Sequence, residues 1–226
     1  MKKYEAVIFD LDDTLYLEIE YVKSGLKEVA MYLSNILNEP DEDIYKELLI
    51  LFKINKENIF NRYLQQKLIN NKNILEYCIE IYRTHYPKII LSNEAKDVLE
   101  YLKYEKKYKL GLITDGRPEG QKNKIRALNL QKYFNYIIIT DELGGIEFRK
   151  PNRLPYIKMI NYLGVEPAKA VYVGDNPAKD FIGAKELGIF TIMVRNKESL
   201  YSQENFPEAY LADAIVENIL ELKEIL

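Results

Sequence analysis

The sequence contains one cysteine, one histidine and no tryptophan. Because Cys78 is alone, no disulfide can form within the chain. The single histidine, His85, argues against a zinc site, since histidine and cysteine are the usual ligands of that metal. We therefore expect carboxylates to carry out any proton transfer.

The sequence also lacks an excess of charge of one sign and lacks long apolar segments. It has 32 basic and 35 acidic residues, for a formal net charge of −3, and no basic stripe that would follow a nucleic acid backbone. No apolar run approaches the roughly 18 residues of a membrane span, and residues 1–5 lack the apolar core of a signal peptide. We expect a cytoplasmic protein that binds neither nucleic acid nor membrane. The sequence does not indicate an oligomeric state.

Short apolar runs of strand length are present and alternate with helical patterns. The runs are continuous, as in strands buried on both faces of a parallel sheet, and they cover 6–9, 110–113, 136–139, 170–173 and 190–194. Helical periodicity lies near 92–102, 125–130, 154–163 and 177–187, the last with Asn176 as the expected N-cap residue and Gly188 as the stop. This alternation predicts an α/β fold with a doubly wound parallel sheet.

The segment from about residue 16 to residue 86 breaks the alternation, because it contains helical periodicity and no convincing strand. Four helices after the first strand are far more than a crossover needs, which favours a small all-helical domain inserted into the chain. We expect this domain at 16–87 and the α/β core domain at 1–15 and 88–226. The alternative is that these helices cover one face of the sheet.

Polar residues follow three of the expected strands. Asp10 and Asp12 follow the first strand, Thr114 follows the second, and Asp175 follows the fourth. The carboxyl ends of parallel strands lie at one edge of a sheet, so we expect these side chains to converge there. Clustered carboxylates repel one another unless a cation is present, and oxygen ligands suit Mg²⁺. For Asp10 and Asp12 alone, the alternative is a capped turn without chemistry.

In order along the chain, the polar motifs resemble those of the haloacid dehalogenase superfamily. The resemblance covers residues 4 to about 195, and its motifs are Asp10-x-Asp12-x-Thr14, Thr114, Lys150-Pro151 and Gly174-Asp175 with Asp180. It implies a Rossmann-like core, with the helical insertion as the cap domain, and Mg²⁺-dependent hydrolysis of phosphate esters through an aspartyl-phosphate.

Carried over to this sequence, the resemblance implies catalytic roles for four residues. Asp10 is expected to attack phosphorus, and Asp12 to protonate the leaving oxygen and then accept a proton from water. Thr114 would hydrogen-bond the phosphoryl group, and Lys150 would neutralise its charge. An acid near neutral pH must have a pKa above the usual value of about 3.9, so we expect a raised pKa for Asp12.

The resemblance also implies a metal site and a substrate site. Mg²⁺ would be held by Asp10, Asp12 (through its backbone carbonyl) and Asp175, with Asp180 and Asn176 in supporting positions. The residues that follow Thr114, which are Asp115, Gly116 and Arg117, are expected to bind substrate together with Thr114 and Lys150.

Several functions share these motifs. Asp12 favours a phosphatase over a dehalogenase, because a halide leaving group needs no acid. The predicted function is hydrolysis of a small phosphomonoester. One alternative is a sugar-phosphate mutase of the β-phosphoglucomutase kind, and another is a non-catalytic protein that binds a phosphorylated ligand.

Overall fold

The computed structural model describes residues 3–195 and 206–226, and it divides the chain into two compact units. One unit consists of Met1–Glu18 and Ile90–Leu226, and the other of Ile19–Ile89. We call them the core unit and the helical unit and describe each by itself.

The core unit is built on a parallel sheet of six strands in the order β3-β2-β1-β4-β5-β6. Their bounds are β1 Ala6–Phe9, β2 Lys109–Thr114, β3 Tyr136–Ile139, β4 Ala170–Gly174, β5 Phe190–Val194 and β6 Ala214–Val216. All four residues of β1 are completely buried, as expected for a central strand covered on both faces.

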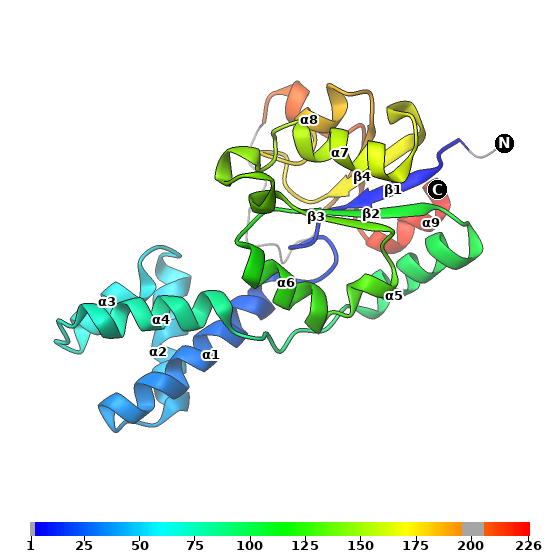
Figure 1. Ribbon diagram of the computed structural model, residues 1–226. Coiled ribbons are helices and arrows are strands. Elements are labelled where there is room, and N and C mark those ends of the chain that lie inside the picture. Colours follow the sequence, from blue (N-terminus) through cyan, green and yellow to red (C-terminus); the bar gives the residue numbers. More distant parts are fainter. Residues whose placement is uncertain (1–2, 196–205) are drawn as a thin grey trace. The chain divides into compact units, whose positions relative to one another are not determined.

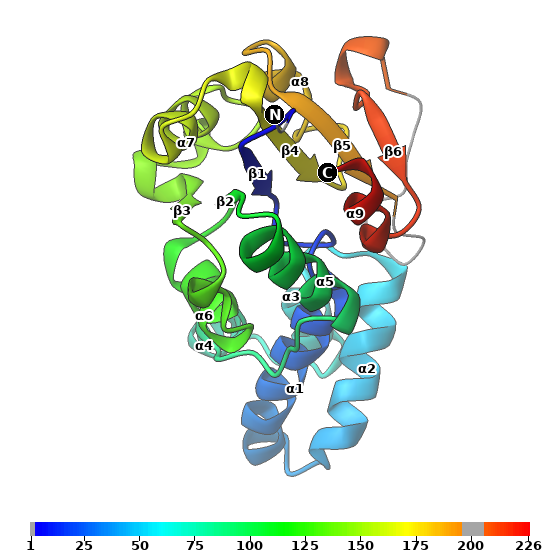
Figure 2. The same ribbon diagram turned by 90° about the vertical axis from the view of Figure 1, so that its right-hand side faces the viewer.

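Helices cover both faces of this sheet. They are α5 Asn93–Glu100, which continues as a π-helical turn at Tyr101–Glu105, α6 Pro118–Ala127, α7 Leu154–Leu163, α8 Ile182–Lys185 and α9 Leu222–Ile225. Figure 1 shows α7 and α8 on one face of the sheet and α5 and α9 on the other, and Figure 2 shows these layers from the side. The doubly wound α/β fold predicted from the sequence is therefore confirmed.

The strand order reverses direction next to β1. The chain adds β2 and β3 on one side of β1, then crosses over and adds β4, β5 and β6 on the other side. Phe9, the last residue of β1, is in register with Leu112 of β2 and Val173 of β4. In open α/β sheets this switch point leaves a crevice at the carboxyl ends of the strands, where ligands bind.

Three sequence predictions differ from the structure. The helix expected near 125–130 lies earlier in the chain, at Pro118–Ala127 (α6). Strand β6 was not predicted, and the helix expected over 177–187 is wrong in its first half, because α8 covers only Ile182–Lys185. Residues 177–179 form a turn and residues 180–181 a bend instead. There the Asp180 carboxylate accepts a hydrogen bond from the backbone N–H of Asn176 at 2.9 Å, and the Asn176 side chain accepts one from the N–H of Ala178 at 3.0 Å. These local bonds compete with a regular helix.

The helical unit contains α2 Asp41–Ile54, α3 Ile59–Gln66, α4 Lys72–Thr84 and, from Ile19 onward, α1 Glu18–Leu37. None of its residues, all of which the structure describes, lies in a strand. Its core takes side chains from all four helices, among them Leu33, Leu48, Tyr63 and Cys78, each of which is completely buried. A helical unit with its own core is consistent with an inserted domain.

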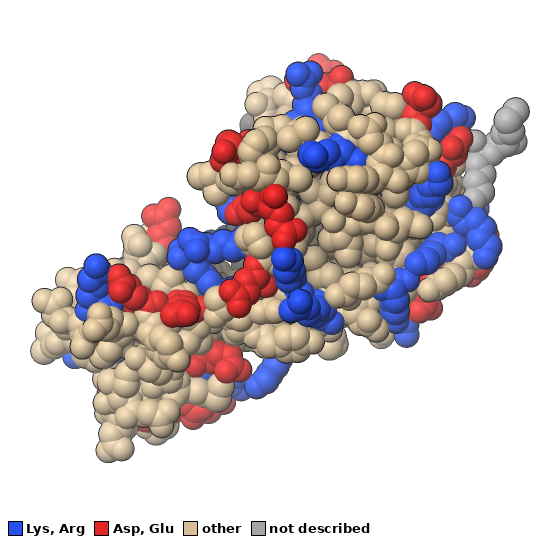
Figure 3. Space-filling model, viewed as in Figure 1, with Lys and Arg blue, Asp and Glu red and all other residues tan. Residues whose placement is uncertain are grey.

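The charge distribution agrees with the composition. On the face shown in Figure 3, basic and acidic side chains are interspersed. Within the described part of the chain, no helix has the length and apolar character needed to cross a membrane.

Candidate active site

The ends of three neighbouring strands carry the polar residues expected to converge. Asp10 follows β1, Thr114 is the last residue of β2, and Asp175 follows β4. The N–H of Asp10 donates to the carbonyl oxygen of Val173 at 2.8 Å, so the chain stays paired with β4 at this point. The topology of the sheet thus places these residues at its carboxyl edge.

A buried ammonium group joins two of the carboxylates. Lys150 Nζ donates to Asp10 Oδ1 at 2.5 Å, to Asp180 Oδ1 at 2.7 Å and to the Tyr172 hydroxyl at 3.0 Å. These side chains are almost completely excluded from solvent. Burial alone would lower the pKa of Lys150, but the adjacent charges of Asp10 and Asp180 outweigh it and hold the pKa well above its usual value. Lys150 is therefore charged at any physiological pH.

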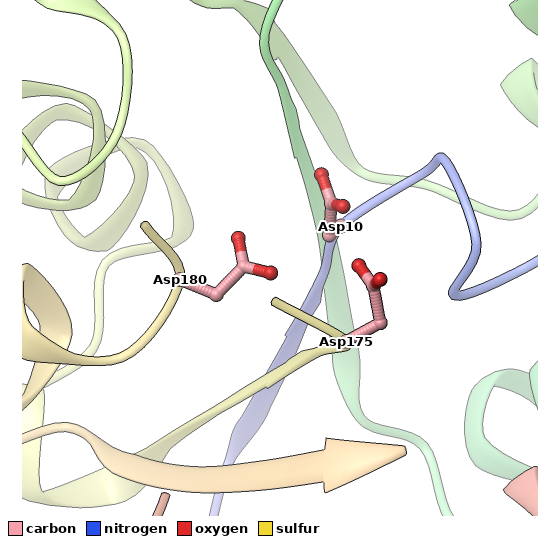
Figure 4. Close-up of side chains that lie close together, drawn as sticks. All are labelled: Asp10, Asp175 and Asp180. Atoms are coloured by element: carbon pink, nitrogen blue, oxygen red, sulfur yellow. The ribbon is translucent and has the colours of Figure 1, made fainter. Parts of the chain in front are cut away.

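Asp10, Asp175 and Asp180 form an acidic cluster, with one oxygen of each lying within 4.8 Å of the others. Figure 4 shows the carboxylates of Asp10 and Asp175 next to each other, with that of Asp180 directed toward them. Burial and the nearby carboxylates of Asp180 and Asp10 raise the pKa of Asp175 to about 9. Burial also raises the pKa of Asp10 to about 6, against the opposing charge of Lys150.

This cluster has the donor atoms that a divalent cation needs. Asp10 Oδ2 is buried and has no hydrogen-bond partner among the described residues. Burial and the neighbouring carboxylates of Asp180 and Asp10 disfavour the charged form of Asp175, and a bound cation would offset this cost. Both oxygens of Asp180, in contrast, already accept hydrogen bonds, from Lys150, Tyr172 and Asn176. The residues thus fit Mg²⁺ on Asp10 and Asp175, with Asp180 supporting Lys150.

Asp12 contacts a different set of residues. Its Oδ1 accepts from Lys124 Nζ at 2.7 Å and from the Tyr16 hydroxyl, and its Oδ2 accepts from Gln121 Nε2 at 3.1 Å. Burial raises the pKa of Asp12, but the Lys124 charge and these hydrogen bonds outweigh burial and lower the pKa below its usual value. The expectation of a raised pKa for Asp12 is therefore wrong for the protein without substrate, because no adjacent cation was foreseen.

The residues around Thr114 divide into buried and exposed ones. Thr114 is fully buried and its hydroxyl accepts a hydrogen bond from Gln121. Asp115 Oδ1 accepts from the Thr140 hydroxyl at 2.9 Å and from the backbone N–H of Lys150 at 3.1 Å, so it holds the segment that carries this lysine. Gly116 has a φ of +137°, which favours glycine. Arg117 is exposed and precedes α6.

A cavity of about 370 Å³ opens at this edge of the sheet, lined by Asp12, Glu18, Asp115, Arg149, Lys150, Asp175 and Lys179. Thr114, Gly116 and Arg117, predicted to bind substrate, do not line it, and neither does Asp10. Burial and the charge of Asp12 raise the pKa of Glu18 to about 7. The Arg149 guanidinium donates twice to Asp141, at 2.7 Å each, which fixes one wall. The cavity thus presents fixed cations next to the acidic cluster.

Several of these residues were not predicted from the sequence. Gln121, Lys124, Arg149 and Tyr172 lie in no motif considered above. Gln121 and Lys124 are three positions apart and therefore share one face of α6, but nothing in the sequence indicated that this face is buried. Tyr172 lies within an apolar strand, where a tyrosine is ordinarily a packing residue.

The sequence and the fold of this chain are similar to those of known hydrolases and phosphatases. The family model for haloacid dehalogenase-like hydrolases matches residues 7–194. The chain is 30% identical over 233 residues to glyceraldehyde 3-phosphate phosphatase of Pyrococcus furiosus, covering 100% of this chain and 94% of that protein. It is 30% identical over 194 residues to phosphoglycolate phosphatase of Aquifex aeolicus, covering 83% of each. A putative β-phosphoglucomutase from Thermotoga maritima has a similar structure, with a TM-score of 0.69, 25% identity and coverage of 98% of this chain and 100% of that one. The chain therefore belongs to the haloacid dehalogenase-like hydrolase family.

Proposed function

We propose that this protein is a phosphatase that hydrolyses a small phosphomonoester in a Mg²⁺-dependent reaction, through an aspartyl-phosphate on Asp10. The main support for the proposal is how the two oxygens of the buried Asp10 carboxylate are bonded. One oxygen is held by Lys150 at 2.5 Å, and the other is buried without a protein partner. We assign the oxygen without a partner to the metal ion and the oxygen beside Lys150 to the attack on phosphorus, where the ammonium offsets the charge of the phosphate.

Charge is the main obstacle to attack by a carboxylate on a phosphate dianion. Lys150 places a permanent positive charge against Asp10, and Lys179 adds a second cation to the cavity wall. Bound Mg²⁺, held by Asp10 and Asp175, would supply further positive charge at the same place. Phosphoryl transfer depends mostly on positioning and electrostatic stabilisation, and buried groups fixed at strand ends provide both.

Two proton transfers complete the proposed reaction. In the first step the phosphoryl group moves from the ester oxygen to Asp10, and Asp12 donates a proton to the departing alkoxide. In the second step Asp12 takes a proton from water as the water oxygen attacks phosphorus and Asp10 leaves. The lowered pKa of Asp12 keeps its carboxyl group ionised, which is the form that the second step requires. A phosphate dianion close to Asp12 opposes the lowering, because like charges raise a carboxyl pKa, and this favours the acid form in the first step.

The substrate class is proposed from the relatives and the cavity. The two relatives compared above are named for glyceraldehyde 3-phosphate and phosphoglycolate, which are small phosphate esters. A volume of about 370 Å³ suits a ligand of that size. We further propose that the helical unit is the cap domain that selects among such esters. The expected cytoplasmic location stays a prediction.

A sugar-phosphate mutase is the second candidate, since the similar structure from Thermotoga maritima is described as a putative β-phosphoglucomutase. A mutase would use the same Asp10 but return the phosphoryl group to a sugar hydroxyl. The two functions differ in whether water enters the second step.

The test is phosphate release from a panel of small phosphomonoesters with Mg²⁺ or with EDTA. Wild type is compared with Asp10→Asn and with Asp97→Asn, a control carboxylate on the exposed side of α5 that pairs with Lys223. Mg²⁺-dependent release that is lost only in Asp10→Asn supports the phosphatase. Interconversion of glucose 1-phosphate and glucose 6-phosphate without release would support the mutase, and no turnover of any ester would overturn both.

A further inference from the structure

One face of α6 is polar and yet buried. Gln121 is 3% exposed and Lys124 is 5% exposed, while Lys122 on the same helix is about half exposed and pairs with Glu142 at 2.6 Å. Lysine is rarely buried to this extent, because removing an ammonium group from water is costly unless a partner compensates. The position of Lys124 therefore needs an explanation in terms of what it contacts.

The buried polar face of α6 holds both oxygens of one carboxylate. Lys124 Nζ donates to Asp12 Oδ1 at 2.7 Å, and Gln121 Nε2 donates to Asp12 Oδ2 at 3.1 Å. The same Gln121 amide group donates to the Thr114 hydroxyl. Two side chains of one helix thus fix the orientation of the Asp12 carboxyl group and link it to the end of β2.

We propose that Lys124 and Gln121 are positioning residues that hold the Asp12 carboxyl group where it exchanges protons with the leaving oxygen and with water. This inference rests on the proposed phosphatase function. Without these two side chains, only the Tyr16 hydroxyl among the hydrogen bonds described above would hold the Asp12 carboxyl group. Displacement of a catalytic group by about 1 Å can cost about 100-fold in rate. None of the four motifs recognised in the sequence includes either residue.

The competing explanation is that these contacts only attach α6 to the loop after β1. Such an attachment would contribute to stability and would affect all substrates equally. A positioning role, in contrast, matters in proportion to how much the leaving group needs a proton. An alkyl phosphate needs the acid strongly, whereas p-nitrophenolate departs without protonation. Leaving-group dependence therefore separates the two explanations.

The experiment compares kcat/KM for an alkyl phosphomonoester and for p-nitrophenyl phosphate, since kcat/KM reports the steps up to departure of the leaving group. Lys124→Met and Gln121→Leu are the test variants, and Lys124→Arg is the conservative variant. Lys122→Met, which removes an exposed lysine of the same helix, is the matched control. The melting temperature of every variant is measured in parallel, so that a loss of folded protein is recognised.

We expect Lys124→Met to lose about 100-fold in kcat/KM on the alkyl ester and less than about threefold on p-nitrophenyl phosphate. Gln121→Leu should show the same selectivity with a smaller loss. Lys124→Arg should recover most of the alkyl ester activity, and Lys122→Met should match wild type on both esters.

Equal losses on the two esters, or no loss on either, would overturn the positioning role even if wild type is an active phosphatase. If Lys124→Met does not fold, the selectivity of Gln121→Leu decides the question. Failure of the phosphatase proposal itself is recognised separately, because wild type would then release no phosphate from either ester.

Discussion

Binding of Mg²⁺ to the acidic cluster should release close to one proton per protein at pH 7. Burial and nearby carboxylates raise the pKa of Asp175 to about 9 in the metal-free protein, and burial raises that of Asp10 to about 6. At pH 7 Asp175 is then mostly protonated and Asp10 mostly ionised. A metal ion binds the ionised carboxylates, so the proton on Asp175 and the small fraction of a proton on Asp10 must leave when it binds.

The number of protons released determines how strongly Mg²⁺ affinity depends on pH. Between pH 7 and about pH 8.5 the apparent Mg²⁺ affinity should rise about tenfold per pH unit, or about 1.4 kcal/mol, and it should level off above about pH 9. The stability of the metal-free protein should move in the opposite direction. Because the folded-state pKa of Asp175 is raised, its contribution to stability is present below pH 4 and is lost as the pH rises toward about 9.

Isothermal titration calorimetry in two buffers of different ionisation enthalpy measures the released protons directly. Asp175→Asn should weaken Mg²⁺ binding and abolish the proton release, and Asp97→Asn, an exposed ion-paired control, should change neither. Mg²⁺ binding without proton release at pH 7 would refute the reasoning, because Asp175 would then be ionised before the metal arrives.

Three substitutions test the structure around the site. Lys150→Met removes the cation shared by two buried carboxylates and should lower the free energy of unfolding, measured by denaturant titration, by about 3–5 kcal/mol. A loss below about 1 kcal/mol would mean that the carboxylates relax toward solvent. Gly183→Ala would place a Cβ atom 2.3 Å from the carbonyl oxygen of Pro151 and should cost about 1–3 kcal/mol by the same method, whereas an unchanged midpoint would show that the backbone yields easily. Ser92→Ala removes the side chain that accepts from the N–H of Ala95 at the start of α5, and should cost about 1 kcal/mol, with Ser92→Asp restoring the stability.

The strands could be predicted from the sequence where burial on both faces produces a continuous apolar run. A strand covered on both faces is apolar throughout, and β1, β3 and β5 lie at the residues expected, while β2 and β4 extend slightly beyond them. Strand β6 has three residues and only one of them is buried, so it gives no apolar run. The helix expected over 177–187 followed local signals, but the Asp180 carboxylate forms tertiary contacts that those signals do not contain.

The candidate site was predictable only as far as topology determines it. Residues that end adjacent parallel strands must lie at one edge, so Asp10, Thr114 and Asp175 could be placed without knowing any contact. The partners of Asp12 could not, since they depend on how α6 is rotated about its axis. A buried lysine on a helix looks in sequence like any solvated lysine, which is why Lys124 was missed and the pKa of Asp12 was expected to shift in the wrong direction.

The hydrogen bond between Lys150 and Asp10 spans 140 positions of the chain, and Asp180 lies 30 positions further on. During synthesis, the whole helical unit is translated before β2. Lys150, which donates to Asp10, is translated later still. Non-local contacts of this kind raise the contact order of a domain and slow its folding. Asp10, the proposed nucleophile, can therefore meet Asp175 and Asp180 only when β4 has paired with β1, and a chain shortened before β4 would lack the acidic cluster.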